Sequence, residues 1–149
     1  MNRFAPALLA LSCTLALAAC HKQESTEQTD HDVAVAAADA ASDVDKAAAE
    51  AAATAAKGQQ EIATVASAGN AKVADAQGHA MEENADANYD VAVAKAEGDR
   101  KVEKERCDGL PSADQKACNT AAESAYDAAK ALAAADRDAA KAQAARIER

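Results

Sequence analysis

The residue with the most specific chemistry in this sequence is Cys20, because of what precedes it. A single basic residue, Arg3, comes before an apolar run from Phe4 to Ala16, and small residues stand directly before the cysteine. A basic start, about a dozen apolar residues and small residues at a cut site are typical of a secretory signal peptide. The run is shorter than the roughly 20 residues that a transmembrane helix needs. The pattern predicts that residues 1–19 direct export and are removed.

The segment Leu17-Ala18-Ala19-Cys20 resembles the lipobox of bacterial lipoproteins. The resemblance implies cleavage between Ala19 and Cys20, a diacylglycerol on the Cys20 sulfur and usually a fatty acyl chain such as palmitate on the new amine. Two or three long chains anchor a protein firmly, since each buried methylene contributes about 0.8 kcal/mol. His21 stands where an inner-membrane retention signal typically has Asp, which implies the periplasmic face of the outer membrane. The alternative is an ordinary secretion signal cut elsewhere, with Cys20 incidental.

With Cys13 in the signal and Cys20 lipidated, Cys107 and Cys118 remain. An even pair in an oxidising compartment predicts a structural disulfide, which stabilises a loop of this size by roughly 3 kcal/mol. A redox-active pair is the alternative, although the spacing is far from C-x-x-C. We expect no metal site, because zinc needs four ligands and the histidines are far apart in polar surroundings: His21, His31 and His79.

No pattern in the chain indicates catalysis. It has no phosphate-binding Gly loop and no G-x-S-x-G, and it lacks the large apolar residues that line a water-excluding pocket. We therefore expect a protein without enzymatic activity or cofactor. The net charge of −9 becomes −10 once residues 1–19, which carry only Arg3, are removed. So acidic a chain is a poor partner for nucleic acid or for an anionic lipid surface.

The composition predicts long helices and a small core. Half of the residues are hydrophobic, but most of these are alanine, and Phe and Trp are missing after residue 19. The branched aliphatic residues after that point are Val33, Val35, Val44, Ile62, Val65, Val73, Val91, Val93, Val102, Leu110, Leu132 and Ile147. Such a composition is close to that of disordered chains, yet alanine, Glu, Lys and Gln are the best helix formers. We expect an all-α protein of marginal stability.

Residues 20–32 are predicted to be a lipidated cysteine followed by a flexible polar tether, with Thr29, Asp30 or Asp32 capping the first helix. Residues 33–106 lack proline and predict a long Ala-rich helix, segmented near residues 57–60 and 69–78, where glycines occur. Small and apolar residues follow coiled-coil spacing at Val44, Ala48, Ala51, Ala55, Gly58, Ile62, Val65 and Gly69. The register then slips by one and continues through Val73, Ala76 and Ala80.

Residues 107–112 predict a turn, followed by a return helix over 113–149. Gly109 suits a helix end, Pro111 cannot continue a helix, and Ser112 with Gln115 has the spacing of a capping box. The expected fold is a disulfide-pinned helical hairpin, with 135–147 beside 69–78, and a possible coiled coil. Its return seam would be Cys118, Ala121, Ala125, Ala128, Leu132, Ala135, Ala139 and Ala142.

Charge is unevenly distributed before the turn. An acidic group (Glu82, Glu83, Asp86, Asp90) precedes a basic group (Arg100, Lys101, Lys104, Arg106). We expect a solvated helix face with intrahelical pairs such as Lys95 with Asp99 and Lys101 with Glu105. A docking surface or a calcium-binding patch is the alternative, although no loop has the Asp pattern of a calcium-binding hand.

A lipobox followed by an Ala-rich helical body looks like the small helical lipoproteins of Gram-negative outer membranes. The segment C-D-G-L-P-S-A-D-Q-K-A-C from Cys107 to Cys118 also resembles a pattern, C-D-x-L then K-x-x-C, of uncharacterised bacterial envelope proteins. The murein lipoprotein is a further parallel, but this chain finishes at Arg146-Ile147-Glu148-Arg149 without the terminal Lys that is crosslinked to peptidoglycan. We expect no covalent attachment to the cell wall.

These observations predict a non-catalytic lipoprotein with a structural or protein-interaction role. Its contacts would be with another copy, through the Ala/Val seam, or with an envelope protein. The alternative is an acidic module that captures or inhibits a basic protein or peptide.

Overall fold

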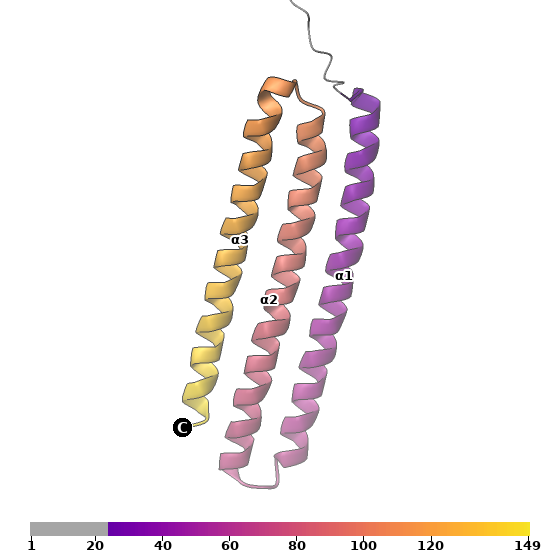
Figure 1. Cartoon of the computed structure of the whole chain (residues 1–149). Helices are drawn as coiled ribbons and strands as arrows, with labels where there is room; N and C mark the ends of the chain where they lie inside the picture. Colours follow the sequence, from indigo (N-terminus) through magenta and orange to yellow (C-terminus); the bar gives the residue numbers. More distant parts are fainter. Residues whose placement is uncertain (1–23) are drawn as a thin grey trace, which may run out of the picture.

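The structure, a computed structural model, describes residues 24–149 and consists of long antiparallel helices (Figure 1). Helix α1 covers Thr26–Val65, α2 covers Asn70–Asp108 and α3 covers Ser112–Ile147. The prediction of an all-α fold is confirmed. Figure 1 shows the three helices side by side, with the start of α1, the end of α2 and the start of α3 at the same end.

Helix α2 lies between the other two and packs against both, whereas no Cα of α1 comes within 8 Å of a Cα of α3. The three helices of residues 24–149 therefore form one open layer and not a closed bundle. Globular domains usually consist of at least two packed layers around a core. A single layer buries only the sides of its helices and leaves both of its faces uncovered.

Helix α1 begins earlier than the sequence predicted. Ser25 is the N-cap, and its Oγ accepts a hydrogen bond from the backbone N–H of Gln28 at 3.2 Å. The predicted tether is therefore wrong for residues 26–32, and Thr29 lies inside the helix, where its side chain reaches the backbone of Gly109. A capped start and this contact with the end of α2 extend the helix through a segment without apolar residues.

The chain reverses at residues 66–69, which the sequence analysis did not predict. Gly69 has a φ of +104°, a conformation that glycine adopts far more easily than other residues. Segmentation of 33–106 was correct, but the segments fold back into a hairpin, and the slip in register coincides with this turn. The break expected at 57–60 is wrong, since α1 continues to Val65.

Two glycines mark the closest approach of α1 and α2. A Cβ at Gly98 would lie 2.6 Å from the Cβ of Ala40, and one at Gly58 would lie 2.8 Å from the Cβ of Ala80. The predicted seam of α1 faces α2, with only Ala48 and the turn residue Gly69 exposed. The glycines that cost helix propensity therefore allow close packing between helices.

The core of residues 24–149 is made almost entirely of small side chains. The buried apolar residues are Ala76, Ala80, Ala85, Ala96, Cys107, Ala122, Ala133 and Ala144. The area that one alanine methyl group buries is small, so the free energy of folding must be spread over the full length of the helices.

The predicted seam of α3 is wrong. Every predicted seam residue from Ala121 to Ala142 is exposed, and Leu132 has 68% of its surface exposed. The buried residues of α3 are instead Ala122, Ala133 and Ala144. Alanines occur on several sides of α3, so spacing alone does not identify the buried side. Tyr126 and Ile147 are half-buried and lie on the side of α3 that faces α2.

We predict that Gly98→Val lowers the free energy of unfolding by about 1–3 kcal/mol, because the new side chain overlaps Ala40 and forces α1 and α2 apart. Urea denaturation followed by circular dichroism measures the loss. Ala53→Val, which adds a β-branched residue at an exposed site of α1, is the control. Equal losses in the two variants would show that close approach at Gly98 is unimportant.

Candidate functional site

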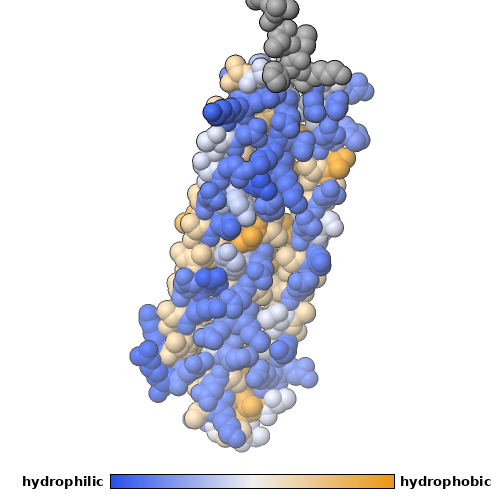
Figure 2. Space-filling model, in the orientation of Figure 1, coloured by the Kyte–Doolittle hydropathy of each residue, from blue (hydrophilic) through white to orange (hydrophobic). Residues whose placement is uncertain are grey.

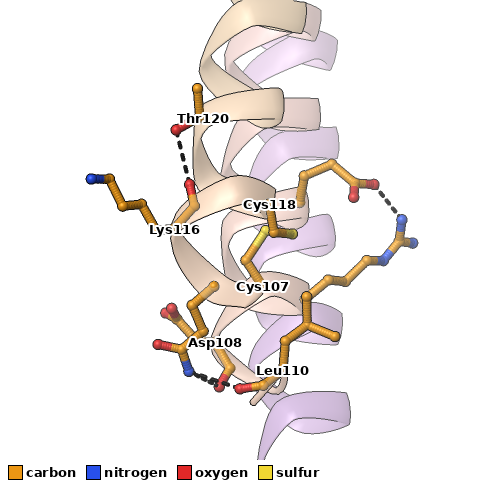
Figure 3. The surroundings of a disulfide bond; sticks show 9 residues. Cys107, Asp108, Leu110, Lys116, Cys118 and Thr120 are labelled. Atoms are coloured by element: carbon orange, nitrogen blue, oxygen red, sulfur yellow. Dashed lines mark hydrogen bonds and ion pairs between the residues drawn. A yellow bond between two sulfur atoms is a disulfide. The ribbon is translucent and has the colours of Figure 1, made fainter. Parts of the chain in front are cut away.

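A disulfide between Cys107 and Cys118 fastens the end of α2 to the start of α3 (Figure 3). Their Cα atoms are 5.6 Å apart, and Cys107 is fully buried. The pairing predicted from the sequence is the one that the structure contains. Because the disulfide lies beside the turn, it fixes how the residues of α2 and α3 align from the start of their contact.

The predicted capping box does not form. Helix α3 has Pro111 at its N-cap, without a side-chain hydrogen bond. Gln115 instead turns back, and its Nε2 donates to the carbonyl oxygens of Asp108 and Leu110, both at 3.0 Å (Figure 3). Gln115 thus satisfies the carbonyl of Asp108, the last residue of α2, which a helix end otherwise leaves without a partner, and also the carbonyl of Leu110 in the turn.

One side of α2 carries a stripe of charged and histidine residues at helical spacing: His79, Glu83, Asp86, Asp90, Glu97, Lys101 and Lys104. Most of the ion pairs between helices involve residues of this stripe. Toward α1, Lys101 pairs with Asp43 at 3.3 Å and Glu83 with Lys57 at 3.5 Å. Toward α3, Asp86 pairs with Lys141 at 2.7 Å, and Lys104 pairs with Glu123. These pairs join the acidic and basic groups of α2 to its neighbours.

Of the two intrahelical pairs that we predicted, Lys95 with Asp99 forms at 2.7 Å. The pairing of Lys101 with Glu105 is wrong, because Lys101 reaches across to Asp43 instead. Sequence spacing identifies neighbours within one helix, but an unpredicted neighbouring helix changes which partner is nearer.

Arg100 is the most connected charged residue of the α2–α3 interface. Its guanidinium donates to Glu97 and, at 3.0 Å, to Glu123, and it lies 5.3 Å from the centre of the Tyr126 ring. Hydrogen bonding from Arg100 lowers the pKa of Glu97, and hydrogen bonds from Lys104 and then Arg100 lower that of Glu123. The same carboxylates raise the pKa of Arg100.

Both tyrosines of the chain lie at this interface, a feature that the sequence analysis missed. Arg137 of α3 stacks 4.8 Å from the ring of Tyr89 on α2, as Arg100 of α2 does with Tyr126 on α3. Cation–π contacts between adjacent helices help to fix the register. The position of each tyrosine within its own helix could not reveal a partner on another helix.

The layer has two unlike faces. We call the face that carries the charged stripe of α2 the charged face, and blue hydrophilic residues run along all three helices there (Figure 2). Two grooves on this face are lined by seven acids (Glu50, Glu61, Asp75, Glu83, Asp86, Asp90, Glu148) and two lysines (Lys57, Lys72). The charged face is therefore strongly acidic despite its ion pairs.

Three grooves open on the opposite face, which we call the neutral face. One lies between α1 and α2, two lie between α2 and α3, and Asp99 and Glu103 of α2 line a groove on each side. Their charged residues are four acids (Asp45, Asp99, Glu103, Asp136) and four bases (Lys95, Arg100, Arg106, Arg137). In a chain with a net charge of −9, this balance distinguishes the neutral face from the rest of the surface.

Several predicted residues are separated or undescribed. Within residues 24–149, no three His, Cys, Asp or Glu side chains come together to hold a metal ion. His31 lies beside Asp32, and His79 lies near Glu61 on the charged face. Ala19, Cys20 and His21 fall outside the described residues. None of the helices in 24–149 has the length and apolar character of a membrane span.

Compared with protein-family models, with curated proteins and with solved structures, the chain matches none of them significantly.

We predict that reduction of the Cys107–Cys118 disulfide lowers the free energy of unfolding by roughly 3 kcal/mol, since the open turn gives the unfolded chain more freedom. Urea denaturation with and without reductant measures this change. The Cys107→Ser/Cys118→Ser variant, which should not respond to reductant, is the control. A dimer on a non-reducing gel that is linked through Cys107 or Cys118 would contradict pairing within one chain.

Acid should destabilise the α2–α3 interface. Because the pKa values of Glu97 and Glu123 lie below the ordinary 4.5, their stabilising effect is present above pH 4.5 and is lost as the pH falls through the lower folded values. Glu123→Gln should therefore flatten the decline in melting temperature below pH 4.5. Asp127→Asn, an exposed neighbour on α3, should keep the original decline. The same decline in both variants would contradict the assignment to Glu123.

Proposed function

We propose that this chain is a non-catalytic lipoprotein with a structural or protein-interaction role, anchored through Cys20 to the periplasmic face of the outer membrane. The observation that carries the interaction role is the excess of acidic residues on one face of a long, single helical layer, whereas acids and bases balance on the other face. Each face of residues 24–149 offers a surface to a macromolecule, with open grooves along the helices.

The position of the anchor gives this layer a direction. The N-terminal part of α1 lies beside the turn between α2 and α3, since the side chain of Thr29 approaches the backbone of Gly109. A lipid on Cys20, only a few residues before Ser25, holds the disulfide turn near the membrane. The turn at 66–69 then lies up to about 60 Å away, at 1.5 Å per helical residue of α1. The partner surfaces extend along the helices between these two ends.

We predict that Cys20→Ala abolishes acylation and membrane fractionation, because the thiol is the site of lipid attachment. Helicity should not change, since residues 24–149 contain all the helices that hold the layer together. Metabolic labelling with a fatty acid and carbonate washing of membranes test the attachment, and circular dichroism tests the fold. A variant that stays with the outer membrane after washing would refute lipid anchoring.

A second candidate function is capture of a basic protein or peptide on the charged face. It is favoured by the groove between α1 and α2 in which Glu50 and Asp90 have no ion-pair partner among residues 24–149. Lys57 is the only base that lines this groove beside Glu50, Glu83, Asp86 and Asp90. A basic chain laid along it would gain charge-assisted contacts.

We predict that an oligolysine peptide binds the full chain at low salt and that Glu50→Gln/Asp90→Asn weakens this binding severalfold. Salt should have the same effect, because ions screen exposed charges over about 10 Å at 0.1 M. Asp45→Asn/Asp136→Asn, which removes as much charge from the neutral face, is the matched control. Equal weakening by both variants would show attraction to net charge and would contradict a specific groove.

A further inference from the structure

The neutral face exposes rows of apolar residues that no helix of residues 24–149 covers. Its exposed apolar positions follow helical spacing along α1 (Ala34, Ala37, Ala41, Ala48, Ala52) and along α3 (Ala121, Ala125, Ala128, Leu132, Ala135, Ala139). These positions belong to one face, because the groove beside Ala41 and the groove beside Ala125 share Asp99 of α2. Leu132, the most exposed large apolar residue of 24–149, lies in the middle of the α3 stripe.

We propose that a second copy of this chain packs on the neutral face, so that two open layers form a two-layer, six-helix dimer. The layer is about 54 Å long, from the 36 residues of α3 at 1.5 Å each, and roughly 20–30 Å wide at 8–10 Å between helix axes. The face therefore offers roughly 1,100–1,600 Å² per copy. A stable dimer buries about 800 Å² per partner, so the face is large enough.

Charge selects this face for self-association. Two copies of a chain with a net charge of −9 repel each other, and the repulsion is greatest between their acidic charged faces. On the neutral face the acids and bases balance, and Lys95 with Asp99 already forms a pair within the face, at 2.7 Å. Pairing through this face keeps both charged faces in solvent. A basic or acidic partner would gain nothing from a balanced surface, which favours an identical one.

The shape of the neutral face fits the same conclusion. Between α1 and α2 it is hollowed by a groove of about 720 Å³. Small and apolar residues such as Ala37, Ala41 and Val102 line it together with five charged side chains of both signs. The α3 stripe, with Leu132 projecting from it, is a ridge that can enter such a groove. In a twofold dimer each copy supplies one ridge and one groove, so both contacts form at once.

This arrangement differs from the association expected through Val44 to Val65. Most of that seam packs against α2 within one chain, and only the exposed Ala48 and the groove-lining Val44 belong to the neutral face. The inference goes beyond the proposed function and does not require the lipid anchor, because it uses only residues of 24–149. A dimer would give the anchored protein two charged faces, one on each outer side.

Sedimentation equilibrium of the full chain in density-matched detergent tests the proposal. We expect a dimer, and we expect Leu132→Lys to raise its dissociation constant about tenfold or more by placing a charge in the apolar contact. Val35→Lys is the matched control: Val35 is 48% exposed and shares its side of α1 with Asp39 and Asp43, which belong to the charged face. It should leave the constant unchanged.

A monomer, or equal effects of Leu132→Lys and Val35→Lys, would overturn the proposal. In cells, a photoreactive amino acid at position 132 should crosslink to a second copy, identified by mass spectrometry, and one at position 35 should not. A crosslink from position 132 to a different protein would also overturn it. These results are separate from the fate of Cys20→Ala, so the dimer and the lipid anchor can fail independently.

Discussion

The structure depends on the close approach that alanine and glycine allow between helix backbones. Gly98 against Ala40 and Gly58 against Ala80 bring α1 and α2 together with almost no side-chain volume between them. Dispersion contacts are individually weak, so a chain that packs with methyl groups must make many of them along long helices. The three helices are therefore long. Because methyl contacts alone fix the alignment of the helices weakly, ion pairs between helices and a disulfide at one turn help to fix it.

The same constraint explains why the molecule is a layer. A closed three-helix bundle needs large side chains to fill the space along its axis, and the buried apolar residues of 24–149 are alanines and Cys107. Small residues favour close pairs of helices instead, and a central helix can form two such pairs on opposite sides. One consequence is that α2 uses both sides for packing. The other is that both faces of the layer stay uncovered, and they differ in net charge.

Much of this fold could be predicted from the sequence, and the rest could not for physical reasons. Helix content follows from alanine, and the turn at 107–112 follows from Gly109, Pro111 and the cysteine pair. The reversal at 66–69 was missed because a glycine in a helical pattern is compatible with a bend, a break or close packing, and only the contacts of α2 distinguish these. The α3 seam and the start of α1 were wrong because local spacing does not contain the neighbouring helix. For the site, the disulfide was predictable, whereas the Arg100 and Arg137 contacts with tyrosines were not.

An open layer and a closed bundle differ most in the distance between α1 and α3. Spin labels on cysteines introduced at Ala41 and Ala125, two exposed sites beside grooves that share Asp99, report this distance by pulsed electron paramagnetic resonance. Labelled chains diluted in unlabelled chains exclude distances between copies. The layer predicts helix axes roughly 20 Å apart, twice the usual spacing of packed helices. A separation near 10 Å would place α1 against α3 and would contradict the open layer.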